Sequence, residues 1–119
     1  MYERIAVASK NGALARHDFG HADEFTVYEN REGRVERVEV RRGRPAHGPR
    51  GQNLGHLAEI IALLSDCQAV MAGGIEFGAR VLLAQRGIRP YEDPALNEDT
   101  VRRMAASWFD PRPREALAA

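Results

Sequence analysis

Residues 67–91 read CQAVMAGGIEFGARVLLAQRGIRPY and contain, in order, the signals of a strand, a helix and a second strand. Residues 67–72 form an apolar run typical of a buried central strand, and the Gly73-Gly74 pair ends it. Apolar side chains then recur at helical spacing until Gly87, a residue type that often follows a helix end. Residues 88–91 predict an edge strand, because their proline cannot donate a ladder hydrogen bond. The stretch therefore predicts a β-α-β unit.

Three further strands are expected before this unit. Residues 5–8, Ile-Ala-Val-Ala, are a short apolar run typical of a buried first strand. Residues 25–28 and 35–40 are rich in aromatic and β-branched side chains, and the glycine-containing turn between them predicts a hairpin. Val35 is out of phase with the two later valines of its strand, which predicts a bulge or a late strand start.

Two more helices complete the expected fold. Asn53 and Asn97 are candidate N-caps, each followed by apolar residues at helical spacing. Residues 41–52 fit no element and predict a loop of about a dozen residues. We expect one α/β domain over residues 1–109, with a five-stranded mixed sheet, a strand meander followed by parallel β-α-β units, and about three flanking helices. Residues 110–119 predict a C-terminal tail.

Composition excludes several classes of function. Seventeen basic residues balance seventeen acidic ones, so no overall field attracts nucleic acid or an anionic membrane. The single cysteine, Cys67, excludes a disulfide framework and zinc sites that need several thiolates, and a buried, inert thiol is expected. No signal peptide is recognisable, and no stretch approaches the ~18 apolar residues of a membrane span. A cytoplasmic protein without nucleic-acid or membrane partners is expected.

The expected topology brings three segments to one edge of the sheet. If the first three strands form a meander and the later ones run parallel to the first, residues 9–22, residues 42–52 and the Gly73–Gly78 turn all leave the same edge. Ligand sites in open α/β sheets favour the carboxyl ends of strands. These segments therefore form the candidate pocket.

The histidines are the candidate metal ligands of this pocket. His17, His21 and His47 lie in the three segments, and His56 lies in the first turn of the following helix. Imidazole is a common ligand for transition metals. Convergence of two or more histidines would form a metal or cluster site, whereas separate surface or hydrogen-bonded histidines would form none. The residues alone leave both alternatives open.

Glycines and arginines are the candidate contacts for an anionic ligand. Gly73 and Gly74 precede a helix, where free amides could hold an anion, although glycines are also needed simply to pack a helix on a sheet. Arg44 and Arg50 belong to an arginine-rich run that is either a solvated surface or an attractor for an acidic partner or cofactor.

The motifs in their order resemble the dinitrogenase iron-molybdenum cofactor biosynthesis family, the NifX/NafY-type domain. The similarity covers roughly residues 3–109 and rests on the following segments: Arg4–Ser9, Phe19–Phe25 with Val27 and Tyr28, His47-Gly48 before Asn53, Asp66-Cys67 with Val70, Gly73-Gly74-Ile75 and Gly87-Ile88. Four positions depart from the family pattern. Asp18 stands where a histidine is usual, His21 where an arginine is usual, and Glu76-Phe77 replaces smaller residues.

The resemblance implies a ribonuclease-H-like fold and a carrier without a reaction of its own. Such domains bind iron-molybdenum cofactor, iron-sulfur precursors or related clusters and hand them on to a donor or acceptor protein of an assembly pathway, as a monomer or homodimer. The implied cofactor contacts are His47, His21, His17, Arg44, Arg50, Gly73 and Gly74, with the three histidines as metal ligands. Because Asp18 replaces the family histidine, His17 or His21 would have to compensate.

Three alternatives remain. A metal-free module for a small anion or a protein partner would share the same fold. A zinc hydrolase would need a general base beside the histidines, and only Asp18 and Glu76 are evident candidates. A two-metal nuclease would need clustered carboxylates, and residues 5–9 and 67–72 contain none. Metal content separates these functions.

Overall fold

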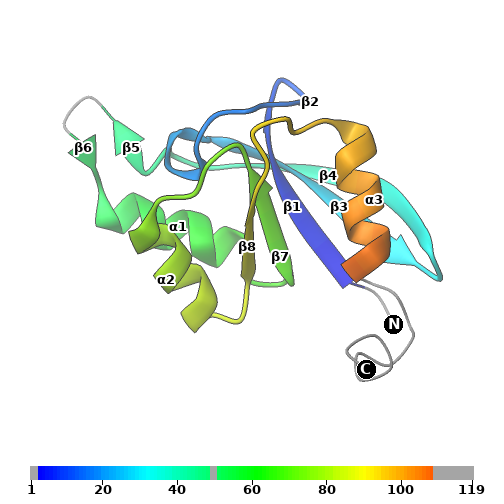
Figure 1. The fold of residues 1–119 in the computed structure, drawn as a ribbon. Helices are drawn as coiled ribbons and strands as arrows, with labels where there is room; N and C mark the ends of the chain where they lie inside the picture. Colours follow the sequence, from blue (N-terminus) through cyan, green and yellow to red (C-terminus); the bar gives the residue numbers. More distant parts are fainter. Residues whose placement is uncertain (1–2, 49–50, 109–119) are drawn as a thin grey trace.

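A mixed sheet with helices on both faces forms the fold of the protein (Figure 1), and the computed structural model describes residues 3–48 and 51–108. Its five long or central strands run in the order β4-β3-β1-β7-β8, and the two-residue strand β2 pairs with β1. This order confirms the expected five-stranded mixed sheet, to which β2 is an addition. Three α-helices flank it, as expected. The end of the predicted domain at residue 109 and the predicted tail, 110–119, lie outside the described residues.

The antiparallel half of the sheet is the predicted meander. β1 (Glu3–Lys10) pairs with β3 (Glu24–Arg31), which pairs with β4 (Arg34–Arg42). The β3–β4 turn has two left-handed residues, Glu32 and Gly33, with φ of 54° and 89°, the geometry that suits a two-residue hairpin. The predicted bulge is confirmed, because the pairing register shifts between Val27 and Tyr28.

The parallel half is the predicted β-α-β unit. β1 pairs in parallel with β7 (Ala69–Ala72), and β7 with the edge strand β8 (Arg89–Glu92). Helix α2 (Phe77–Gln85) connects β7 to β8, and Gly87 has the left-handed φ of 75° expected just beyond a helix. The meander and this unit together bring the ends of β1, β4 and β7 to one edge.

Alternating side chains divide the core into two layers. Odd-numbered residues of β1, Ile5 and Val7, pack beneath α3, and even-numbered ones, Ala6 and Ala8, pack beneath α1 and α2. Alternation across a strand puts successive side chains on opposite faces, so a fully apolar run is covered on both. Each fully buried aliphatic side chain contributes about 1.5–3 kcal/mol.

Both predicted asparagine caps are confirmed. The Asn53 side chain accepts a hydrogen bond from the amide of His56 at the start of α1 (Leu54–Leu63). The Asn97 side chain accepts from the Thr100 amide at 2.9 Å, at the start of α3 (Glu98–Trp108). Among the described residues, no helix is long and apolar enough to span a membrane.

Short elements appear where the sequence predicts only loops. The expectation that residues 41–52 hold no element is wrong, because β5 (His47–Gly48) and β6 (Gly51–Gln52) form a two-stranded hairpin. β2 (Ala13–Leu14) and a single 3-10 turn, η1 (Phe19–His21), lie in the predicted loop after β1. Two or three residues are too few to produce a periodic pattern, so backbone pairing with distant segments decides these elements.

Candidate functional site

A buried glutamate holds the turn that leaves β1. Glu24 is 3% exposed and accepts hydrogen bonds from the Ser9 hydroxyl at 2.6 Å and from the amides of Asn11 and Gly12 at 3.1 and 2.9 Å. The bond from Ser9 and these amides hold the pKa of the Glu24 carboxyl below its ordinary value. Arg42 of β4 lies 3.2 Å from the same carboxylate. These contacts fix the turn, and the segment after it crosses the edge of the sheet.

The segment that follows pairs directly with the glycine turn after β7. The amide of Gly73 donates to the carbonyl of His17 at 3.2 Å, and the amide of Phe19 donates to the carbonyl of Gly74 at 2.8 Å. A Cβ on Gly73 would lie 1.9 Å from the Arg16 carbonyl oxygen, and one on Gly74 would lie 2.5 Å from an Asp18 oxygen. The Gly73 amide already has a protein acceptor. Close packing requires Gly73, whose Cβ would clash with backbone, whereas the flexible Asp18 side chain can move away from a Cβ on Gly74. The contact of both glycines with a bound anion stays a prediction.

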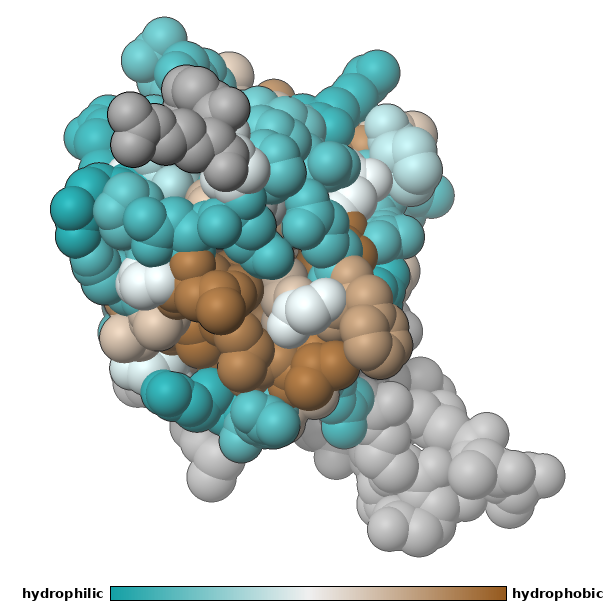
Figure 2. Space-filling model, turned by 90° about the vertical axis from the view of Figure 1, so that its left-hand side faces the viewer, coloured by the Kyte–Doolittle hydropathy of each residue, from teal (hydrophilic) through white to brown (hydrophobic). Residues whose placement is uncertain are grey.

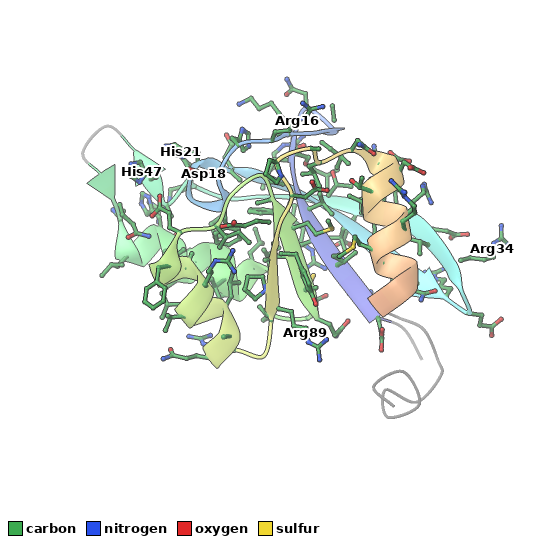
Figure 3. The ribbon with its side chains drawn as sticks, in the orientation of Figure 1. Arg16, Asp18, His21, Arg34, His47 and Arg89 are labelled. Carbon is green, nitrogen blue, oxygen red and sulfur yellow. The ribbon has the colours of Figure 1, made fainter. Side chains whose placement is uncertain are left out.

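Two of the predicted histidines come together at this edge. The ring centroids of His21, from η1, and His47, from β5, lie 4.5 Å apart with the rings tilted by 45°. Figure 3 shows both side chains, with Asp18, at the end of the sheet beside the β5–β6 hairpin, whereas Arg34 and Arg89 lie far from them. Gly20 lies against His47, because an added Cβ on this glycine would be in ordinary contact with the His47 Cβ at 3.5 Å.

Each of these imidazoles faces a carboxylate through Nδ1. Asp18 Oδ2 lies 3.9 Å from His21 Nδ1, and Glu76 Oε1 lies 3.7 Å from His47 Nδ1. The His47 Nδ1 atom is buried and makes no hydrogen bond with the described residues. Sequence reasoning considered both acids only as general bases. Their place beside the two histidines depends on loop packing that has no local sequence signal.

His17 lies outside the ring contact of His21 and His47. Its Nε2 atom is buried without a hydrogen-bond partner among the described residues. No group of three or more histidine, cysteine or acidic side chains in residues 3–48 and 51–108 is arranged to hold a metal ion. The structure therefore brings together the rings of His21 and His47, and a ligand role for His17 stays a prediction.

The predicted arginine contacts have other partners or lie outside the described residues. Arg44 forms an ion pair with Glu59 of α1, and Arg50 lies outside the described residues. The Nδ1 atom of His56 is 3.2 Å from the Pro45 carbonyl oxygen, so this histidine belongs to the base of the hairpin. A pocket of about 480 Å³ lies there, lined in part by Arg44 and His56.

The thiol is remote from the two histidines. Cys67 precedes β7, whereas the glycine turn follows β7, so the two lie at opposite ends of that strand. Burial raises the pKa of the Cys67 thiol to about 12, and Asp66 beside it acts in the same direction. A neutral, buried thiol is a poor nucleophile and a poor metal ligand. The expectation of a buried thiol is confirmed.

An apolar patch lies near the site on the helical face. Figure 2 shows this side of the molecule, where apolar surface interrupts a mostly hydrophilic one. The exposed large apolar side chains of α1 and α2 are Leu54, Phe77 and Val81, and Phe77 is 81% exposed. Phe77 directly follows Glu76, so the patch begins beside the two histidines.

The chain is a small α/β domain. Its two paired imidazoles form a candidate ligand site on the loops at the carboxyl ends of parallel strands. The family described as dinitrogenase iron-molybdenum cofactor matches residues 1–108, and the chain belongs to this family. The resemblance drawn from the sequence motifs is thereby confirmed.

The relatives are longer proteins. The chain is 35% identical over 105 residues to the FeMo cofactor biosynthesis protein NifB of Frankia alni, covering 86% of this chain and 21% of that protein. It is 32% identical over 118 residues to the NifB of Sinorhizobium fredii, covering 97% of this chain and 24% of the relative. The chain thus spans under a quarter of the length of these curated relatives.

A solved structure shares the fold. The crystal structure of PH0822 superposes with a TM-score of 0.64 at 16% sequence identity, covering 90% of this chain and 97% of the other. At this identity the similarity concerns the fold alone. The α/β domain with a mixed sheet and three helices is confirmed, and the ribonuclease-H-like assignment stays a prediction.

Proposed function

We propose that this domain is a non-catalytic carrier that binds an iron-molybdenum or iron-sulfur type cluster, or its precursor, during cofactor assembly. The observation that carries the proposal is the His21–His47 pair, two imidazoles with ring centroids 4.5 Å apart at the loop edge of the sheet. Membership in the iron-molybdenum cofactor family supports this class of cargo.

The donor set fits a preassembled cluster better than one assembled on the protein. A self-assembled iron-sulfur cluster takes about four thiolates, and the chain has only the buried Cys67. A cluster that brings its own sulfides needs only one or two protein ligands, which His21 and His47 can supply. The Nδ1 atom of His47 is buried and has no hydrogen-bond partner among the described residues, so the hydrogen bonds of this imidazole are incomplete.

Weak, reversible attachment suits a carrier. Two neutral nitrogen ligands on exposed loops hold cargo less firmly than a closed set of thiolates, so the cluster can pass to an acceptor protein. Asp18 and Glu76 oppose an anionic cluster, which weakens its attachment further. The donor and acceptor are proteins of the same assembly pathway.

The test is an anaerobic titration of the full chain with purified iron-sulfur and iron-molybdenum clusters, followed by visible absorption and metal analysis. We expect about one cluster per chain or per dimer. The double variant His21→Ala/His47→Ala should lose binding, whereas His56→Ala, which removes a histidine bonded to the Pro45 carbonyl, should retain it. Adding His17→Ala to the double variant separates the part played by the third predicted ligand.

The results of this titration distinguish a cluster carrier from the alternative function, a metal-free interaction module. Equal binding by the double variant and the native chain would exclude the assigned ligands. Absence of binding by the native chain, with no metal retained from expression, would favour the metal-free interaction module, for which the exposed Phe77 and Leu54 are the relevant surface.

A further inference from the structure

The carboxylate of Glu76 makes no capping hydrogen bond to the helix that it precedes. Glu76 occupies the N-cap position of α2 with φ of −63° and ψ of 153°. Its side chain turns instead to His47, with Oε1 3.7 Å from Nδ1. Gly20 lies between the elements, and an added Cβ there would lie 3.8 Å from the same oxygen.

The charged side chains near Glu76 form ion pairs with other residues, so the Glu76 carboxylate faces His47. Arg80, one helical turn into α2, lies 2.8 Å from Glu92 and donates a hydrogen bond to the carbonyl of Ile75. On the opposite element, Asp18 faces His21. Within the described part of the chain, His47 is the only charged partner of Glu76.

Burial decides which nitrogen of His47 can meet a ligand. The side chain is 35% exposed, yet Nδ1 is buried, so the accessible part of the ring lies on the side of Nε2. A neutral imidazole that binds a metal through Nε2 carries its proton on Nδ1. That proton has no hydrogen-bond acceptor among the described residues, and the carboxylate of Glu76, 3.7 Å away, is the anion that faces this nitrogen.

We propose that Glu76 is a positioning residue: its carboxylate, 3.7 Å from Nδ1 and so beyond hydrogen-bond distance in this structure, draws the proton of the neutral His47 ring to Nδ1, closes to hydrogen-bond distance when Nε2 binds the ligand, and thereby fixes the ring and its tautomer. The assignment to a metal cargo rests on the proposed function, whereas the tautomer does not. Carboxylates that hold metal-binding histidines in this way change metal affinity by about 10–100-fold.

The tautomer is tested first, without any metal. The full chain labelled with ¹⁵N is studied by long-range proton–nitrogen NMR in alkaline solution, where imidazoles are neutral. We expect His47 to carry its proton on Nδ1 in the native chain and to lose that preference in Glu76→Ala. Glu76→Gln, which keeps an oxygen acceptor, should restore part of it. Glu36→Ala, at the far end of the sheet with a side chain 46% exposed, is the control.

Cluster affinity is tested second, on the same proteins. Glu76→Ala should weaken binding by about 10–100-fold, with smaller losses for Glu76→Gln and none for Glu36→Ala. An unchanged His47 tautomer in Glu76→Ala would overturn the positioning role. A changed tautomer in a chain that binds no cluster would sustain the positioning role and overturn only the proposed cargo.

Discussion

Gly73 and Arg16 approach so closely that a Cβ on the glycine would lie 1.9 Å from the arginine's carbonyl oxygen. The contact joins the turn after β7 to the segment that carries His21, and the Gly73 amide reinforces it by donating to the His17 carbonyl. Backbone meets backbone here, so neither side can yield by a change of rotamer. The geometry of the candidate site depends on this contact.

Gly73→Ala should destabilise the domain by about 2–3 kcal/mol, the usual cost of forcing an extra methyl group into a packed interior. The free energy of unfolding in urea measures the effect. Gly78→Ala is the matched control, because a Cβ there meets nothing within 4 Å and the position is helical. It should stabilise the domain by roughly 1 kcal/mol. Equal effects of the two substitutions would contradict the close-packing account.

Glu24→Gln should destabilise the domain and reduce the dependence of its stability on pH. The folded-state pKa of this carboxyl is lowered, so its stabilisation is present above the ordinary glutamate pKa and is lost as pH falls through the lower folded value. Urea unfolding of the native chain and the variant from neutral to acidic pH measures the difference. The gap between them should be widest near neutral pH, and a gap that grows toward low pH would show that the sign is wrong.

Cys67 should react slowly with thiol reagents in the folded protein. Burial raises its pKa to about 12, so almost no thiolate is present near neutral pH. Reaction with an aromatic disulfide reagent, followed by absorbance, should be complete in denaturant and slow in native buffer. Cys67→Ala should leave cluster binding unchanged, since the residue lies at the other end of β7. Rapid labelling of the native thiol would argue against its burial.

Phe77→Ser should leave stability within about 0.5 kcal/mol of the native value, because the side chain is 81% exposed. Phe19→Ser, in contrast, removes a side chain that is 1% exposed and packs on Phe25 with ring centroids 5.5 Å apart. It should cost about 3–5 kcal/mol. Thermal unfolding of the two variants measures the contrast, which would vanish if Phe77 were covered in solution.

The predicted elements with long apolar patterns are all present. The run 5–8, the β-α-β unit of residues 67–91 and the helices capped by Asn53 and Asn97 carry periodic signals that agree with the structure. Residues 41–52 contain a hairpin where the sequence predicts a loop. The sequence gives no sign of it because β5 and β6 pair over only two residues each. Such short pairing leaves no pattern in composition.

For the site, the sequence predicted the edge but not the partners. Topology predicted His17, His21 and His47 at one edge, and the structure brings the rings of His21 and His47 together. Arg44, an expected cofactor contact, is paired with Glu59 on a neighbouring helix. The contact of Glu76 with His47 has no signal in the sequence, because Glu76 precedes α2 and His47 lies in β5, two segments that are distant along the chain.

Periodicity, caps and glycine positions in the sequence determined the order of elements, the two-sided burial of β1 and the edge that collects the loops. These features follow from local backbone preference and from the need to bury apolar side chains. Only the tertiary structure decided which histidines meet, which nitrogen of His47 is buried and which carboxylate faces it. Loop side chains are positioned by contacts between distant segments, such as Gly73 with Arg16 and Gly20 with His47, and such contacts exist only once the sheet has formed.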